Sequence, residues 1–590
     1  MRKKQWVCVF LFLGILTATF SACGGQEQSW PSAESSTEIL SDVVEEISVI
    51  ETDPAMPESV WVEESSDVED ISSIAEPEAT EPEQTAETVE ELAPAVDYSE
   101  MYPIFDEPES FTIWVANSPD LSDVISDFSD FLVISEMEKL TNLHWDANLV
   151  SFTASQETFG LMLASQDYTD VINGAVAGYT GGGDAAVDDD VILDIQDYIP
   201  ENMPALSDWM DRYPDLRKSM ISNDGHICGF PKIQDPFYKA VSSGMVRKDW
   251  LDDLGMEVPK TYDDLHNVLL AFRDEKQASA PMQIGAPTGV QDELLAGYNI
   301  SGLYYQVDGE VRLGALQPEY KDYLNMVHQW YDEKLIDPDF TTNAFGLLLD
   351  YTKVLNDQAG VWYTCNLTNI GVLEANAADP NFSALSFSDV SVDGGPVHCA
   401  RKQNMWNPDA WSITTVCDDP ASICKYVDYL YSRDGVVLCN YGVEGYTYEY
   451  DADGNRVFTD VMLNNPDYSY SMCLNIYTCD MQTQVPYVLD SRKETSNYNE
   501  DQWASYYSSG ENADDAYMLP PYMAMTPEES TEYAAIYSDI ETYMDENVSK
   551  FVTGDKSLEE FDDFVAALKQ MNVDRCVELQ QTAYDRYMAK

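Results

Sequence analysis

The stretch FTIWVAN at residues 111–117 opens the run of elements that decides the fold. It is a short apolar run of β-forming residues and predicts a buried strand. The patterns that follow are a helix over 121–140, an alternating strand at 143–150, a short helix at 157–165 and a buried strand at 170–174. Strands that alternate with helices are typical of an open parallel α/β sheet. Ligands of such sheets bind beyond the carboxyl ends of the strands, and Asn117 ends the first strand.

Helix starts further along the chain carry capping boxes, in which a Ser or Thr and an acidic residue three positions later bond each other's backbone N–H groups. The candidates are Thr261 with Asp264, Thr526 with Glu529, and Ser557 with Glu560. Because two of the three fall after residue 520, we expect the C-terminal part to be mostly helical.

The first 22 residues predict an export signal. Arg2, Lys3 and Lys4 precede an apolar run at residues 6–20, which is shorter than the roughly 20 residues that span a bilayer. Ser21-Ala22 followed by Cys23 resembles the bacterial lipobox, in which the cysteine is lipidated. We therefore expect residues 1–22 to be a lipoprotein signal peptide and Cys23 to be a lipid anchor. An ordinary signal peptide with an incidental cysteine is the alternative.

Residues 23–101 predict an acidic, disordered tether. The segment is rich in Glu, Asp, Ser, Thr and Pro, and residues 24–109 contain no Lys or Arg. High charge with little apolar surface does not offset the entropy lost on folding. The folded body is therefore expected to span residues 102–590.

Composition excludes several functions. The chain has 106 acidic and 31 basic side chains and a net charge of −75, which disfavours nucleic acid as a partner. The sequence has no nucleophile elbow, no zinc-protease motif and no P-loop, and its five histidines are scattered. We therefore predict no catalytic residues, no metal and no cofactor, and expect the protein not to be an enzyme.

Two further patterns were interpreted structurally. DADGNRVFTD at residues 451–460 begins like a calcium loop, but Gly454 and Met462 stand at the wrong positions for an EF-hand, so a β-hairpin is favoured. The chain has 11 cysteines, nine of them after Cys23. An odd number without a CxxC motif favours free thiols, although a Cys473–Cys479 or Cys417–Cys424 bridge remains an alternative.

Several stretches resemble one family. They are EMEKLTNLHWDANLV at 136–150, LMLASQDYTDVING at 161–174, VRKDWLDDLGMEVPKTYDDLHNVLLAFRD at 246–274 and YLYSRDGVVLCNYGVEGYTYEYDADGNRVFTD at 429–460. These are similar to the extracellular solute-binding proteins of ABC importers, carbohydrate-type family 1, and to the large lipoproteins of this family in Firmicutes. The resemblance covers nearly all of residues 102–590. Departures at Asn142, Gln166 and Thr169 affect local turns.

The resemblance implies an α/β, two-lobed periplasmic-binding-protein-like (type II) fold with hinge-crossing strands and a helical C-terminal part. The crossings are expected near residues 230–245, 360–366 and 404–413. The family captures its ligand between the lobes and delivers it to membrane permease subunits. We therefore expect a monomer held by its lipid at the extracytoplasmic face of the cell membrane.

An oligosaccharide is the expected ligand, because aromatic faces pack on sugar C–H surfaces while Asp, Asn and Glu accept hydroxyl hydrogen bonds. The candidate residues are Asn117, Asp235, Trp362, Tyr363, Trp406, Trp411, Glu444 and Tyr446. For each Trp or Tyr the competing interpretation is core packing. Two alternative functions remain open: the same fold binding a peptide or a cationic small solute, and a surface glycan-binding lipoprotein without transport.

Overall fold

The computed structural model describes residues 89–590, except for short gaps at 118–120, 122–123, 235–242, 286–289, 344–349, 365–368, 401–405, 453, 480–484, 491 and 496–499. The predicted signal peptide, Cys23 and the tether up to residue 88 lie outside the described residues. In the described part, no helix combines the length and the apolar composition that a bilayer crossing requires.

The first sheet has six strands in the order β14-β4-β11-β3-β1-β2. Its members are β1 (Glu109–Asn117), β2 (Leu143–Ser151), β3 (Val171–Asn173), β4 (Phe230–Gln234), β11 (Trp406–Ile413) and β14 (Val488–Leu489). β1 runs parallel to β2 and β3, whereas β11 is antiparallel to both β3 and β4. β14 is parallel to β4. All strands except β11 therefore end at the same edge of the sheet.

The early strands confirm the sequence pattern, because β1, β2 and β3 match the predicted runs. The helix expected over 121–140 is different: α3 covers only Leu132–Thr141. Before it, the side chains of Asp127 and Asp130 cap a short 3₁₀ turn at Phe128–Asp130. Short polar side chains compete in this way with helical hydrogen bonds, so the apolar spacing upstream belongs to turns.

The second sheet has four strands in the order β10-β5-β9-β6. They are β5 (Ser243–Arg247), β6 (Met282–Gln283), β9 (Val361–Thr364) and β10 (Ala384–Phe387). β5 is antiparallel to β9 and β10, and β6 is parallel to β9. The chain therefore changes sheet between β4 and β5 and again between β10 and β11, close to two of the predicted crossings. The crossing predicted near residues 360–366 needs correction, because residues 361–364 form an inner strand of the second sheet.

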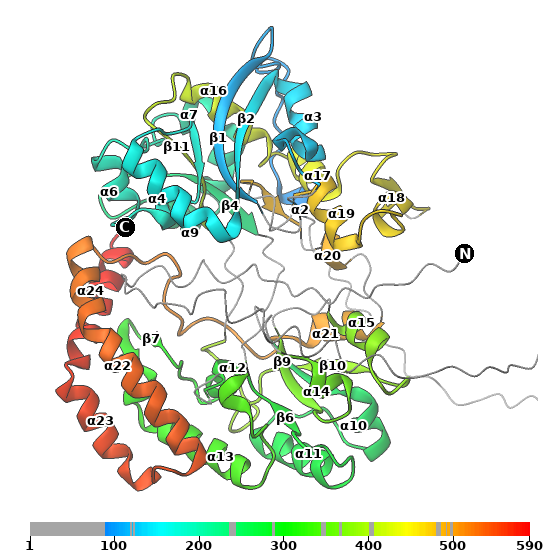
Figure 1. Cartoon of the computed structure of the whole chain (residues 1–590), viewed down its shortest axis with the longest axis vertical. Helices are drawn as coiled ribbons and strands as arrows, with labels where there is room; N and C mark the ends of the chain where they lie inside the picture. Colours follow the sequence, from blue (N-terminus) through cyan, green and yellow to red (C-terminus); the bar gives the residue numbers. More distant parts are fainter. Residues whose placement is uncertain are drawn as a thin grey trace, which may run out of the picture. The chain divides into compact units, whose positions relative to one another are not determined.

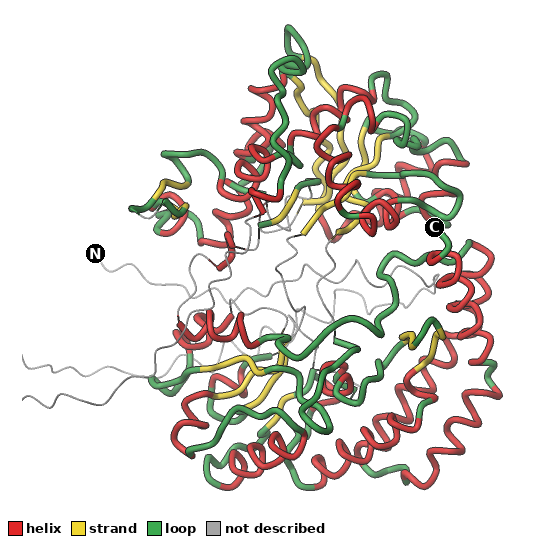
Figure 2. The backbone as a smooth tube through the Cα atoms, turned by 180° about the vertical axis from the view of Figure 1, so that it is seen from behind, coloured by secondary structure: helices red, strands yellow, loops and turns green. Residues whose placement is uncertain are grey.

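Helices flank the strands of both sheets (Figure 2). The helices that accompany the first sheet are α2 (Val89–Leu92), α3, α4 (Ser155–Ser165), α5 (Ala175–Gly178), α6 (Gly182–Asp188), α7 (Ile199–Asn202), α8 (Pro204–Arg212), α9 (Pro214–Met220), α16 (Pro420–Tyr429), α17 (Arg433–Tyr441), α18 (Asp460–Leu463), α19 (Tyr470–Tyr477) and α20 (Arg492–Thr495). The helices that accompany the second are α10 (Lys248–Leu254), α11 (Tyr262–Asp274), α12 (Asp292–Ala296), α13 (Pro318–Asp332), α14 (Thr352–Leu355), α15 (Asn369–Asn376), α21 (Glu500–Ser508), α22 (Pro527–Thr553), α23 (Phe561–Gln570) and α24 (Val573–Met588).

Each sheet has its own main hydrophobic core. The first contains Trp145, Trp209 and Trp411, and the second contains Trp250, Tyr323 and Trp330. The second core also takes in buried residues of α22, α23 and α24, the helices at the orange-to-red end of the chain in Figure 1. All three predicted capping boxes are present. The helical C-terminal part predicted from the sequence is thus confirmed and belongs to the second lobe.

Residues 89–102 pack against the first lobe, although residues up to 101 were expected to belong to the tether. Ala93 and Tyr98 are buried, and the Tyr98 hydroxyl donates to Asp428 Oδ2 at 2.7 Å. Tyr102 donates to the carbonyl oxygen of Lys425 at 2.6 Å and stacks on Tyr98. The apolar and aromatic side chains of this segment supply the burial that holds it to the lobe.

Two small two-stranded sheets complete the fold, β7 (Tyr304–Val307) with β8 (Glu310–Leu313) and β12 (Tyr448–Tyr450) with β13 (Arg456–Phe458). The second pair is antiparallel and confirms the hairpin predicted at the DADGN sequence. The eight cysteines among the described residues are buried and form no disulfide, including Cys417, Cys424, Cys473 and Cys479. Neither of the bridges considered from the sequence is formed.

Candidate functional site

Five strands of the first sheet end at one edge, and polar side chains stand at several of these ends. Asn117, Ser151, Asn173 and Gln234 are the last residues of β1, β2, β3 and β4. Asp490 follows the end of β14 and is buried. Carboxyl ends of parallel strands form the usual ligand-binding edge of an open α/β sheet, so these residues define the candidate site on the first lobe.

Two oxygens at this edge are buried without a donor. Asn117 is 7% exposed, and neither its Oδ1 nor Oε1 of Gln234 has a hydrogen-bond partner among the described residues. Buried polar atoms in native proteins are nearly always hydrogen-bonded, because an unmet acceptor costs free energy. Both oxygens are therefore suited to accept hydrogen bonds from a bound molecule.

The second sheet has a corresponding edge. Since β6, β9 and β10 run in the same direction, Gln283, Tyr363 and the residues just after β10 lie at one end of the sheet. The Gln283 amide nitrogen donates to the carbonyl oxygen of Asp350 at 2.9 Å, while its Oε1 is buried and has no described partner. The Tyr363 hydroxyl is also buried and has no described partner. Like the edge of the first sheet, this edge carries buried polar groups that have no described hydrogen-bond partner.

Two carboxylates complete the second edge, and we name Glu293, Tyr363 and Asp389 the acidic cluster. Glu293 belongs to α12 and is 7% exposed, and its Oε1 is buried with no described partner. Asp389, two residues beyond β10, is half-buried. Burial, together with the charge of Glu293, raises the pKa of Asp389 to about 7. Burial, with the charges of Glu293 and Asp389, also raises the pKa of Tyr363.

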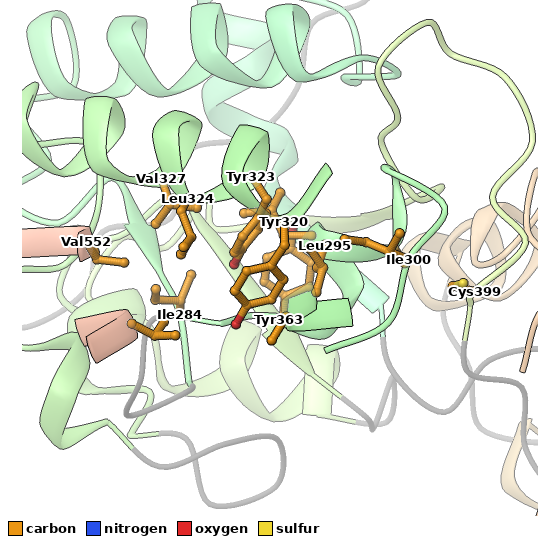
Figure 3. Packing of buried hydrophobic residues seen from close by; sticks show 14 of the residues in the cluster. Ile284, Leu295, Ile300, Tyr320, Tyr323, Leu324, Val327, Tyr363, Cys399 and Val552 are labelled. Atoms are coloured by element: carbon orange, nitrogen blue, oxygen red, sulfur yellow. The ribbon is translucent and has the colours of Figure 1, made fainter. Parts of the chain in front are cut away.

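The acidic cluster rests on a layer of buried tyrosines. Tyr323 and Tyr363 lie among Leu295, Ile284 and other apolar side chains of the second core (Figure 3). The Tyr323 hydroxyl accepts from the backbone N–H of Gln291 at 2.9 Å, and the Gln291 side chain donates to Glu293 Oε2. Glu293 is therefore held in place through one oxygen while the other stays unpaired.

Two predicted aromatic platforms are core residues instead. Trp411 is 0% exposed and packs edge-on against Trp145 with ring centroids 5.3 Å apart. Trp362 is also 0% exposed and belongs to a small apolar cluster with Phe382. Alternate residues of a strand point to opposite faces, which places Tyr363 in a different core cluster from Trp362. The burial of these two Trp residues agrees with the core-packing interpretation, because neither offers an exposed ring face.

The remaining predicted residues fall into three groups. Asn117 and Tyr363 lie at the two carboxyl edges described above. Glu444 and Tyr446 are exposed on the turn before β12, where Tyr446 packs edge-on against Tyr477 at 5.9 Å. Asp235 lies outside the described residues, as does the side chain of Trp406, whose backbone begins β11. The ligand-binding roles of all of these stay predictions.

The binding residues predicted from the sequence do not include Gln234, Gln283, Glu293 or Asp389. Gln234 carried a usable signal, because it ends a predicted crossing segment next to Asp235. Nothing local marks Glu293 or Asp389 among 106 acidic residues. Glu293 lies on α12 and Asp389 beyond β10, so tertiary packing between distant segments brings them to this edge.

In the described ranges, no group of three His, Cys, Asp or Glu side chains lies close enough together to bind a metal ion. The histidines have separate partners: His226 contacts Asp194 at 3.0 Å, and His398 contacts Asp514 at 3.0 Å. In His226 the hydrogen bond to Asp194 raises the pKa. These pairs are spread through both lobes and form no common centre.

Comparisons with known proteins agree with this geometry. No family model matches the chain. It is 25% identical over 501 residues to the fructooligosaccharide ABC transporter substrate-binding protein FusA of Streptococcus pneumoniae, covering 78% of this chain and 88% of that protein. It is 22% identical over 354 residues to the polygalacturonan/rhamnogalacturonan-binding protein YtcQ of Bacillus subtilis, covering 55% of this chain and 65% of that protein.

Solved structures show the fold. The alginate-binding protein AlgQ2 matches with a TM-score of 0.61 and 22% identity, over 82% of this chain and 99% of that chain. An HMO-binding solute-binding protein of Bifidobacterium longum infantis matches with a TM-score of 0.65 and 19% identity, over the same shares. The chain has the two-lobed solute-binding-protein fold, and the resemblance to ABC-transporter solute-binding proteins is confirmed.

Proposed function

We propose that this protein is a lipid-anchored, extracytoplasmic solute-binding protein that captures an oligosaccharide and delivers it to the permease of an ABC importer. The main support for the proposal is a set of four buried oxygens at the carboxyl edges of the two sheets. None of them has a described hydrogen-bond donor, and they belong to Asn117, Gln234, Gln283 and Glu293. An oligosaccharide presents many hydroxyl donors, and each one that meets such an oxygen replaces an unmet acceptor by a hydrogen bond.

The named relatives support this ligand class. FusA is named for fructooligosaccharide, and YtcQ for polygalacturonan and rhamnogalacturonan. Both are binding proteins, which supports a function without covalent chemistry.

Anchoring at Cys23 is part of the proposal. Cys23 follows the apolar run of the predicted signal and precedes the acidic segment of the sequence. Replacing Cys23→Ser is expected to release the protein into the medium or the soluble fraction while leaving ligand binding unchanged. Retention of the Cys23→Ser variant in the membrane fraction would show that another segment anchors the chain.

Thermal unfolding tests the ligand class. The chain from residue 24 onward is heated with neutral and acidic oligosaccharides, peptides and polyamines, one at a time. Binding to the native state alone stabilises by roughly 2.7 kcal/mol at a hundredfold excess over Kd. A rise in unfolding temperature with one glycan group supports the proposal, whereas a rise only with peptides or polyamines refutes the oligosaccharide.

A further inference from the structure

The charge of the preferred glycan can be inferred from the acidic cluster, on the basis of the function proposed above. The relatives named here include proteins named for fructooligosaccharide, a neutral glycan, and for polygalacturonan, an acidic one. The fold therefore accommodates both kinds, and the residues of each chain decide between them.

Glu293 on α12 and Asp389 beyond β10 lie at the same edge of the second sheet. The Gly285 N–H, two residues after β6, donates to Gln291 Oε1 at 3.2 Å, and the Val390 carbonyl oxygen lies against Gly297 at the end of α12. No basic side chain is among the groups that shift the pKa of Asp389 or of Tyr363. The Arg247 guanidinium, on β5 of the same sheet, is already paired with Asp249 at 2.6 Å and Asp357 at 2.6 Å. It is also fully buried between the rings of Trp250 and Phe382. Arg247 is therefore committed to the core.

The unpaired groups of the cluster make it more than a patch of surface acids. Glu293 is more than nine-tenths buried and leaves Oε1 without a described partner. The Tyr363 hydroxyl, from a different element, is 4% exposed and equally unpaired. A carboxylate oxygen accepts hydrogen bonds, and a phenol hydroxyl donates or accepts them. The cluster therefore suits sugar hydroxyls both as donors and as acceptors.

We propose that the acidic cluster of Glu293, Tyr363 and Asp389 binds an uncharged sugar unit through its hydroxyl groups and selects neutral oligosaccharides over those made of uronic acids. A vicinal diol donates to the Glu293 and Asp389 carboxyl oxygens, and each hydrogen bond to an ionised oxygen is charge-assisted and stronger than a neutral one. A uronate places a further carboxylate beside Glu293 and Asp389. Juxtaposed like charges of this kind suppress binding, by roughly tenfold or more for one close pair.

Isothermal titration calorimetry tests this with the chain from residue 24 onward. The neutral probes are fructo-, xylo-, gluco- and manno-oligosaccharides, and the acidic probes are oligogalacturonate and oligoalginate of matched length. We expect a neutral probe to bind at least about tenfold more tightly than either acidic probe. Equal or tighter binding of an acidic probe would overturn the inference and leave the proposed function standing. Failure of every glycan to bind would instead refute the proposed function.

Two substitutions assign the preference to the cluster. Glu293→Gln and Asp389→Asn keep the side-chain shapes and are each expected to weaken neutral binding at least about fivefold and to narrow the gap to the acidic probes. The matched control is Asp545→Asn on α22, where burial and the charge of Glu541 also raise the pKa of the carboxyl. It should leave both affinities unchanged.

Asp389 is half-buried, so its variant provides the test even if replacement of the more deeply buried Glu293 prevents folding. Circular dichroism establishes which variants fold. If folded Asp389→Asn binds both kinds of probe as the unaltered chain does, the cluster does not select the ligand. If every charge-removing variant, Asp545→Asn included, changes both affinities equally, the effect belongs to net charge and the inference is also refuted.

Discussion

Substitution of Tyr98 by Phe measures how residues 89–102 are fixed to the first lobe. The Tyr98 hydroxyl donates to Asp428 Oδ2 at 2.7 Å, and the same carboxylate accepts from the backbone N–H groups of Leu206 at 2.9 Å and Ala205 at 3.1 Å. Asp428 thus joins the segment to the start of α8. Burial raises the pKa of Asp428 to about 6, although all three hydrogen bonds act to lower it.

The magnitude depends on pH. Above the pKa of Asp428 the substitution removes a hydrogen bond to a buried charge, which costs roughly 1.5–3 kcal/mol. Below it the carboxyl is neutral in the folded protein, and the cost falls to about 0.5–1.5 kcal/mol. The sign follows from linkage: Tyr98 lowers the folded pKa relative to the Phe variant, so its extra stabilisation is present at high pH and is lost as the pH falls through about 6.

Urea unfolding of the chain from residue 24 onward, at about pH 8 and about pH 5, provides the measurement. The control is Tyr102→Phe, because Tyr102 donates to a backbone carbonyl oxygen of Lys425, which does not titrate. We expect a cost of about 1 kcal/mol at both pH values for the control. An equal cost of Tyr98→Phe at the two pH values would refute the assigned role of Asp428.

Three further predictions concern the cores. Arg247→Met should cost about 3–5 kcal/mol of unfolding free energy in urea by removing the fully buried cation that pairs with Asp249 and Asp357. The half-buried Arg273, whose partner Asp274 is 57% exposed, should cost less than about 1 kcal/mol when replaced by Met; similar costs would contradict the burial argument. Gly244→Ala should lower stability by roughly 1–3 kcal/mol, because the new Cβ would lie 2.2 Å from the Phe387 ring, while Gly160→Ala on α4 meets open space and should gain about 0.5–1 kcal/mol. Dithiothreitol should leave the unfolding temperature unchanged and native thiols should react slowly with Ellman's reagent, since the described cysteines are buried and form no disulfide; a drop in unfolding temperature would reveal a disulfide.

The early strands, the caps and the C-terminal helices could be predicted because their signals are local. The strand β1 is a run of apolar β-formers, and the Thr526 box sets the start of α22 through contacts within four residues. The start of α3 could not be predicted from apolar spacing alone, because Asp127 and Asp130 divert the preceding turn by short-range hydrogen bonds.

Most of the candidate site depends on pairing between distant segments. A buried strand such as VWYT at residues 361–364 has the same composition in a crossing and in the middle of a sheet, so its place was predicted wrongly. Trp362 and Trp411 were proposed as platforms, yet large apolar rings gain more free energy from full burial. Glu293 stands on α12 and Asp389 beyond β10, and only tertiary packing, which no local pattern records, brings these distant segments to one edge.

The central claim is that the two carboxyl edges bind an oligosaccharide without altering it. A calorimetric titration of the chain from residue 24 onward with the most stabilising glycan, followed by chromatography of the recovered glycan, tests it most directly. We expect saturable binding of about one glycan per chain, a negative heat-capacity change on binding, and recovery of the glycan at unchanged length. The absence of saturable binding, or a shortened glycan, would contradict it.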